Sequence, residues 1–330
     1  MLNFIIRRML AMVITLFFIS ILSFLIIELP PGSALDAELQ RLRSLGGDLP
    51  AEQIRALEQR YGVHDPVHVK YWKWVSGIVL RGDFGTSFVY NQPVGPLIAG
   101  RLGYSILLAG TSLLFAWLVA IPIGVYSATH RNSLPDYLIT TLQFIGVAVP
   151  EFLLALVLLV FASRVLQADV GGGGLFSQRY QTESWSMGKF VDMLAHIWLP
   201  VLVVSAGSTA WLTRVMRANL LDVLNSQYIQ TARAKGLKEG VVIWKHAVRN
   251  ALHPLIMTLG GVLPALIGGE VIASIVLNLP TGGPLFIRAL QNQDMYLAAT
   301  FLMFSSILLV IGNLLADILL TWVDPRVRLE

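Results

Sequence analysis

The chain has 330 residues, of which 55% are hydrophobic and only 13% are charged, whereas roughly 25% of the residues in a soluble domain are charged. This composition indicates an integral membrane protein, and the absence of Cys excludes disulfides, zinc-thiolate sites and thiol catalysis. The net charge of +4 does not indicate nucleic acid binding, because positively charged flanks of membrane spans give the same imbalance.

Six stretches are apolar enough to cross a bilayer, which takes about 20 residues in a helix. They are Met9–Leu29, Tyr104–Thr129, Tyr137–Phe161, Ile197–Met216, Leu255–Leu277 and Leu297–Val323. The first stretch follows two Arg residues like a signal peptide, but it is longer than the usual apolar run of about 7–15 residues. We therefore predict an all-α membrane protein with six transmembrane helices, the first of which is retained.

Residues 31–101, between the first two stretches, are predicted to form a helical extracytoplasmic segment. One helix is expected over PAEQIRALEQRY, residues 50–61, and a second over DPVHVKYWKWVSGIVL, where Asp65 can cap the start and Gly82 can end it. The second helix carries the aromatic residues Tyr71, Trp72 and Trp74. Such residues favour the headgroup level of a membrane, so this helix is expected either to lie along the outer interface or to pack against the spans.

Basic residues predict the orientation, because Lys and Arg in short connections stay inside. Arg7 and Arg8 place the N-terminus inside. Six crossings then place the polar stretch 222–254 and the tail 324–330 inside as well. The expected organisation is an N-terminal span (1–30), the outer segment, a five-helix core (102–323) that contains the polar stretch, and a cytoplasmic tail.

Some spans contain residues that break helices, and these can shape a cavity, because broken backbone in a membrane must be buried in protein or wet. The breakers are Pro122 with Gly124, Gly146 with Pro150, and Pro264 with Gly268 and Gly269. Polar residues that can line a pathway are Gln143, Ser205, Ser208, Thr209 and Asn313. Helix packing explains such residues better, because Ser, Thr and Asn commonly join helices inside bilayers. We favour the packing interpretation for each.

The chain lacks G-x-x-x-x-G-K-[ST], the loop that holds nucleotide phosphates, so it is not expected to bind ATP by itself. No catalytic, cofactor-binding or metal-binding residue is predicted. An ion-coupled secondary transporter would instead need an ionisable group in the membrane. The candidates are Glu28, Glu151, Glu270 and Asp317. For these acids a structural role is the favoured interpretation.

The polar stretch YIQTARAKGLKEGVVIWKHAVRNALHP, residues 228–254, is predicted to form two short helices. The first covers Tyr228–Lys235, and Gly236 suits the left-handed conformation at its end. The second runs from about Lys238 to Leu252 and stops before Pro254. From physical chemistry alone, this hairpin is either a docking element or a capped loop.

Within this hairpin, TARAKGL followed by KHAVRNALHP resembles the cytoplasmic coupling signature, the EAA loop, of permeases in ATP-binding-cassette (ABC) importers of the dipeptide/oligopeptide branch. Other segments resemble that branch in the same order, from the RRM start through ELPPG, RYGVHDP and RGDFGTSF to the closing DPRVR. One departure is Gln230, which stands where the loop usually begins with an acid.

The resemblance implies a type I importer permease of the bacterial inner membrane that is not itself an enzyme. It would work with a second related permease chain, two cytoplasmic ATPase subunits that carry ATP and Mg, and an extracytoplasmic binding protein. The residues expected to contact the ATPase subunits are Gln230, Thr231, Ala232, Ala234, Lys235, Gly236, Leu237 and Lys238.

Short peptides are the expected cargo, with oligosaccharides, opines or nickel as alternatives known in the same branch. An ion-coupled secondary transporter and a membrane scaffold without a pathway are the remaining hypotheses.

Overall fold

The computed structural model describes residues 2–28, 52, 65–87, 89–168, 170 and 174–323. Within these residues the chain is helical, and its extended pairing is limited to one isolated bridge between Thr86 and Pro93. The all-α prediction is therefore confirmed. The chain divides into two units, the first of residues 1–105 and 281–307 and the second of residues 106–280 and 308–330. Apart from Glu52, the predicted helix over residues 50–61 lies outside the described residues, as do the tail 324–330 and the side chain of Glu28.

Three described helices are long and apolar enough to cross a membrane: α5 (Val94–Thr129), α9 (Trp198–Leu224) and the Met295–Leu319 part of α15 (Met295–Val323). The number becomes four if the bent pair α6 (Leu134–Ala148) and α7 (Glu151–Arg164) is one span. α1 (Leu2–Glu28) and α13 (His253–Val276) match the first and fifth predicted stretches. The count of six crossings stays a prediction.

The first unit packs α4 (Val67–Arg81) against α1 through aromatic rings. Trp74 is buried and stacks on Phe24 with ring centroids 5.8 Å apart, and the Tyr71 hydroxyl lies 2.8 Å from Ser20 Oγ. Trp72 is 70% exposed. α4 therefore packs against α1 through one face and leaves an aromatic residue free on the other.

The ends of α4 test two predictions about its caps. Gly82 adopts φ +64° after the last turn, as predicted. The expected Asp65 cap is wrong: Pro66 is the N-cap residue and no side chain caps the helix. Asp65 lies one residue before the N-cap position, too early for its side chain to reach the first free N–H groups of the helix. Its carboxylate instead accepts a hydrogen bond from Lys73 Nζ at 2.6 Å.

A buried carboxylate organises the other part of the first unit, which also contains α14 (Gly282–Gln291). Asp294, fully buried just before α15, accepts from Ser87 Oγ at 2.5 Å and from the Val89 N–H at 3.2 Å. It also accepts from the N–H of Leu297 in the first turn of α15, at 3.3 Å. The segment after α4 is thereby fixed to the start of α15, although no sequence pattern pointed to this contact.

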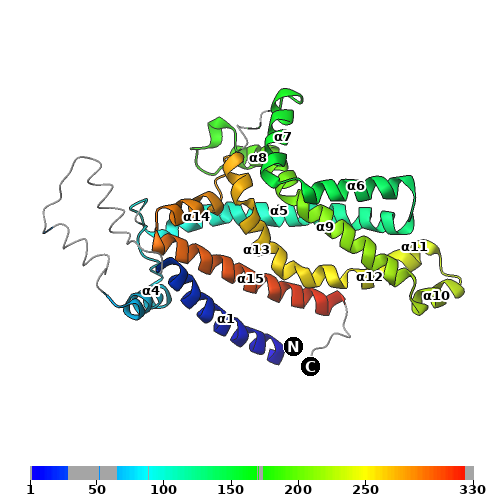
Figure 1. Ribbon diagram of the computed structural model, residues 1–330, viewed down its shortest axis with the longest axis horizontal. Coiled ribbons are helices and arrows are strands. Elements are labelled where there is room, and N and C mark those ends of the chain that lie inside the picture. The colour runs from blue at the N-terminus through cyan, green and yellow to red at the C-terminus, as the bar shows by residue number, and fades with distance from the viewer. Residues whose placement is uncertain are drawn as a thin grey trace. The chain divides into compact units, whose positions relative to one another are not determined.

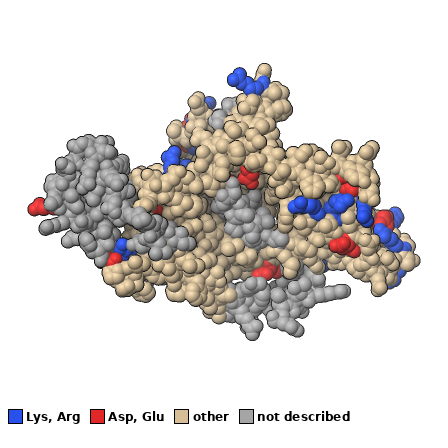
Figure 2. Space-filling model, viewed as in Figure 1, with Lys and Arg blue, Asp and Glu red and all other residues tan. Residues whose placement is uncertain are grey.

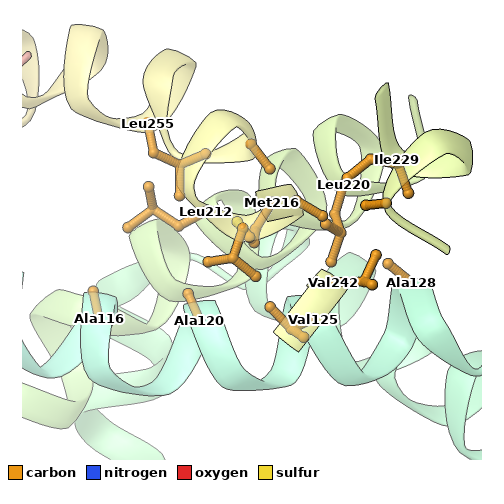
Figure 3. Close-up of a cluster of buried hydrophobic side chains, with 14 residues drawn as sticks. Ala116, Ala120, Val125, Ala128, Leu212, Met216, Leu220, Ile229, Val242 and Leu255 are labelled. Atoms are coloured by element: carbon orange, nitrogen blue, oxygen red, sulfur yellow. The ribbon is translucent and has the colours of Figure 1, made fainter. Parts of the chain in front are cut away.

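The core of the second unit lies between α5 and α9. Small residues of α5 face large residues of α9 (Figure 3); the α5 residues are Ala116, Ala120, Val125 and Ala128, and the α9 residues are Leu212, Met216 and Leu220. All seven are at most 5% exposed. Small residues let helix backbones approach closely, and Gly124 completes this face because an added Cβ would lie 2.8 Å from Met216 Cβ.

The breaker residues act differently from one helix to another. α5 continues through Pro122 and Gly124 without interruption, so the expected break there is wrong. The break predicted at Gly146 with Pro150, within the span Tyr137–Phe161, is confirmed, because α6 ends before Pro150 and meets α7 at an angle of 108°. The bend lies at Val149, which is extended with φ −78° and ψ 122°, the conformation that the ring of a following Pro150 imposes.

Candidate coupling site

The hairpin begins directly after α9, which extends eight residues beyond its predicted end at Met216 and stops at Leu224. Asn225 and Ser226 connect it to α10 (Gln227–Ala234). In Figure 1, α10, α11 (Glu239–Val241) and α12 (Val248–Ala251) cluster at this end of α9. Because the connection has only two residues, a displacement of α10 acts directly on the end of α9.

Gly236 forms the elbow of the hairpin with φ +75°, as the sequence predicted. Two hydrogen bonds close the end of α10: the Gly236 N–H donates to the Arg233 carbonyl at 2.9 Å, and the Leu237 N–H donates to the Ala232 carbonyl at 3.4 Å. This pair of bonds is a Schellman motif, in which the residue after the helix must be left-handed. The elbow is therefore a defined turn.

The structure divides the eight predicted coupling residues into two groups. Ala232 is buried in the core, together with Ile229 from the same helix. The exposed residues are Gln230, Thr231, Ala234, Lys235, Gly236, Leu237 and Lys238. Lys and Arg side chains gather with Asp and Glu at this end of the second unit (Figure 2). One face of α10 thus attaches the hairpin to the protein, and the other face is free to meet a partner.

An ion pair across the elbow joins the two arms of the hairpin. Arg233 Nη2 donates to Glu239 Oε1 at 2.6 Å, and Arg233 Nε lies 3.2 and 3.1 Å from the two Glu239 oxygens. These hydrogen bonds hold the pKa of the Glu239 carboxyl below its usual value. Both side chains are about half exposed, so solvent screens the pair.

Glu239→Gln is expected to lower the free energy of unfolding of the purified complex by only about 0–1 kcal/mol at pH 7. Because the pKa of Glu239 is lowered in the folded state, the pair stabilises the fold above the carboxyl's unfolded pKa of about 4.3 and loses this contribution as the pH falls further. Thermal unfolding of variant and wild type at several pH values checks this. Their difference should disappear at acidic pH, and a difference that grows there would contradict the assignment.

The second arm departs from the predicted single helix from Lys238 to Leu252. After α11 the backbone forms a π-helix, η3 (Val242–Ala247), before it returns to α-helix in α12. The predicted stop before Pro254 is confirmed, because α12 ends at Ala251 with Leu252 as its C-cap. A new helix, α13, begins at His253 and has Pro254 in its first turn, where the missing N–H is not needed.

Hydrogen bonds attach this second arm to the preceding helices. Asn250 Nδ2 donates to the Tyr228 hydroxyl of α10 at 2.7 Å, and Asn219 Nδ2 of α9 donates to the Ala251 carbonyl at 3.5 Å. Val242 and Ala247 are fully buried in the same core as Ile229. The two arms therefore form one packed element, and π-helical turns are frequent at functional sites.

The candidate pathway residues do not gather into a site within the described part of the chain, where no hydrogen bond joins their side chains. Gln143 and Ser205 are buried, Ser208 and Thr209 are half-buried, and Asn313 is exposed. Ser208 Oγ donates to the Ser205 carbonyl of its own helix at 2.9 Å. α6 and α9 approach closely near Gln143, since a Cβ on Gly146 would lie 3.1 Å from Ala210 Cβ. This arrangement favours a role in helix packing, and not in lining a pathway, for these residues.

The acids considered for ion coupling lie on different helices. Glu151 occupies the first turn of α7 directly after the bend, Glu270 is fully buried on α13, and Asp317 is half-buried on α15. Among the described residues, no group of three or more His, Cys, Asp or Glu side chains is arranged to hold a metal ion.

Comparison with known proteins identifies the family. Residues 1–109 match the model of the N-terminal part of binding-protein-dependent transport system membrane components, and residues 120–329 match the model of the binding-protein-dependent transport system inner membrane component.

Relatives match along almost the whole chain. The chain is 39% identical to the oligopeptide transport system permease protein AppB of Bacillus subtilis over 98% of this chain and 99% of the relative. It is 33% identical to a putative peptide permease of Brucella ovis and 32% identical to the glutathione transport system permease protein GsiC of Salmonella typhimurium, each over 99% of both chains. The chain therefore belongs to the family of inner membrane permease components of binding-protein-dependent ABC importers.

Proposed function

We propose that this chain forms half of the translocation pathway of an ABC importer for short peptides. The observation that carries the proposal is the match of 98–99% of the chain to permeases named for oligopeptides, peptides and glutathione. The other half of the pathway is a second related permease. Two cytoplasmic ATPase subunits bind ATP and Mg, and a binding protein outside the membrane delivers the peptide.

The hairpin of residues 222–254 is the part of this chain that receives the work of ATP hydrolysis. Its exposed face around Gly236 meets an ATPase subunit, and its buried face, with Ile229 and Ala232, transfers the movement to the core. Such a switch requires contacts that differ between two states. The two-residue connection from α9 to α10 supports this role, because so short a connection lets α10 move very little without also moving α9.

The experiment is uptake of labelled peptides by proteoliposomes that contain both permeases, the ATPase subunits and the binding protein. We expect uptake to require ATP and to survive ionophores that remove proton and sodium gradients. Uptake that follows an ion gradient and ignores ATP would contradict the proposal and favour a secondary transporter. Absence of any flux from a well-assembled complex would favour a scaffold.

Cargo is tested separately by ligand binding to the partner binding protein. We expect affinity for short peptides. A binding protein that takes an oligosaccharide, an opine or nickel and no peptide would leave the importer intact and correct the substrate.

Topology is testable because the chain has no native Cys. Ser184 and Lys238 are both exposed, and we predict that Ser184 lies outside and Lys238 inside. An impermeant thiol reagent added to intact cells should label Ser184→Cys and should label Lys238→Cys only after the membrane is opened. Labelling of Lys238→Cys in intact cells together with protection of Ser184→Cys would mean that the chain has the opposite orientation in the membrane.

A further inference from the structure

An ion pair between a buried carboxylate and a partly exposed arginine joins the start of α6 to α9 in the second unit. Asp136 is only 2% exposed, and its carboxylate accepts from Arg217 Nε at 2.9 Å and Arg217 Nη2 at 2.8 Å. The Ser127 hydroxyl of α5 also donates to this carboxylate, and Arg217 Nε lies 3.0 Å from Ser127 Oγ. Three helices therefore meet at one carboxylate, in the two-pronged geometry that gives Arg–carboxylate pairs their specificity.

The turn between α5 and α6 is built to aim Asp136 inward. Asn132 adopts φ +62°, and its N–H donates to Asp136 Oδ2 at 3.0 Å. Ser133 is the N-cap of α6 and accepts from the Asp136 N–H at 3.3 Å. Pro135, in the first turn, has no N–H that needs a partner. Backbone and side chain of Asp136 are both fixed, so this orientation is specified locally.

Among the described residues, α6 contributes no side chain to the buried hydrophobic cluster that joins α5 and α9. Its apolar side chains point away from the protein; those more than half exposed are Leu134, Tyr137, Leu138, Leu142, Phe144 and Ile145. The buried residues of α6 are Asp136 and Gln143. Two regions thus attach α6 to α9: the ion pair at its start, and the close approach of Gly146 to Ala210 near its end.

The ion pair also lies on the route from the hairpin to the bend. Arg217 is two turns before the end of α9, whose last residue is two residues from α10. From Asp136, α6 runs to the 108° bend before Pro150 and continues as α7. A displacement of the hairpin that moves α9 therefore reaches α6 and the bend through Arg217 and Asp136.

We propose that Asp136, Arg217 and Ser127 are positioning residues that make α5, α6 and α9 move as one body when the hairpin is displaced, and so convert ATP hydrolysis into substrate movement. This inference rests on the proposed function of the hairpin. The hydrophobic core couples the hairpin to α5 and α9, and the ion pair extends the coupling to α6 and α7. Without the ion pair, the hairpin would still bind the ATPase subunits, but a movement of α9 would no longer move α6 by the same amount.

The test measures assembly, ATP hydrolysis and peptide uptake in proteoliposomes for Asp136→Asn and for the exchanged pair Asp136→Arg with Arg217→Asp. Asp136→Asn keeps the shape of the side chain and removes its charge. We expect normal co-purification of the ATPase subunits, nearly wild-type hydrolysis, and about a tenfold fall in peptide moved per ATP, within the roughly 5–150-fold range of couplings between sites. The exchanged pair should recover part of this ratio. Glu183→Gln, an exposed acid of the second unit that lies outside the hairpin and only 3.7 Å from the exposed Arg179, is the control and should leave the ratio unchanged.

Ser127→Ala provides a milder variant in case Asp136→Asn does not assemble, because it removes one donor to the carboxylate and leaves the ion pair in place. We expect a smaller fall in peptide moved per ATP, in a complex that assembles normally. The proposal is overturned if the ratio stays at the wild-type value in an assembled variant, or if hydrolysis and uptake decline in parallel with the amount of assembled complex. A wild-type complex without ATP-dependent uptake would refute the proposed function, and with it this inference.

Discussion

Gly236→Val is expected to abolish substrate transport while the protein still inserts into the membrane. Gly236 holds φ +75° in the Schellman motif that ends α10, and a β-branched side chain fits this region poorly, at a cost on the order of 1–2 kcal/mol or more. No atom lies within 4 Å of the position that its Cβ would take, so the cost is backbone strain alone. The elbow would open, and the two arms of the hairpin would lose their relative position.

Gly240→Val is the matched control. Gly240 lies in the same hairpin, is exposed, and also has open space around an added Cβ, but it lies inside α11 and has no positive φ. The same substitution should therefore cost little there. Gly236→Asn should fall between the two, because Asn tolerates the left-handed region better than other residues with a Cβ.

The measurement compares peptide uptake, ATP hydrolysis and co-purification of the ATPase subunits among these three variants. Gly236→Val should either bind the ATPase subunits weakly or hydrolyse ATP without moving peptide. If Gly236→Val transports at the wild-type rate in a normally assembled complex, the elbow is a capped loop without a coupling role. If Gly240→Val is equally damaging, the hairpin is sensitive to bulk at its surface, and backbone geometry is not the cause.

The features that sequence predicted are those set by local chemistry. Helical membrane spans follow from long apolar runs, because a lipid environment leaves the backbone no partner outside the helix. The turn at Gly236 and the end of α4 at Gly82 follow from the one residue type that adopts a positive φ without strain. Each of these depends on residues that are close in sequence, so a single chain is enough to read them.

The features that sequence missed depend on partners far apart in the chain. Asp136 and Arg217 are separated by 81 positions, and Asp294 and Ser87 by 207, so neither pair leaves a local pattern. Pro122 and Pro150 illustrate the same limit. α5 continues as a helix through Pro122, whereas the chain bends by 108° just before Pro150. Whether a proline interrupts a helix depends on whether the surrounding helices support a straight or a broken backbone.

Gly124→Ala is expected to destabilise the protein, although Ala is usually the better helix former. The added Cβ would lie 2.8 Å from Met216 Cβ, 2.9 Å from Met216 Cγ and 3.0 Å from the Thr213 carbonyl oxygen. All of these are shorter than an ordinary contact, and overpacking of this kind costs about 1–3 kcal/mol. Since this face holds α5 against α9, Gly124→Val should separate the helices further and lower the yield of folded protein.

Gly110→Ala on the same helix should change the stability of the protein in the opposite direction. Gly110 is exposed and an added Cβ meets no atom within 4 Å, so the substitution should be neutral or should stabilise the helix by up to about 1 kcal/mol. Thermal unfolding of the purified complex in detergent compares the two. Met216→Ala should not rescue Gly124→Ala, because Met216 Cβ and the Thr213 carbonyl oxygen would remain in place. Recovery of wild-type stability in that double variant would mean that the flexible end of Met216, and not the spacing of the two backbones, sets the need for glycine at this position.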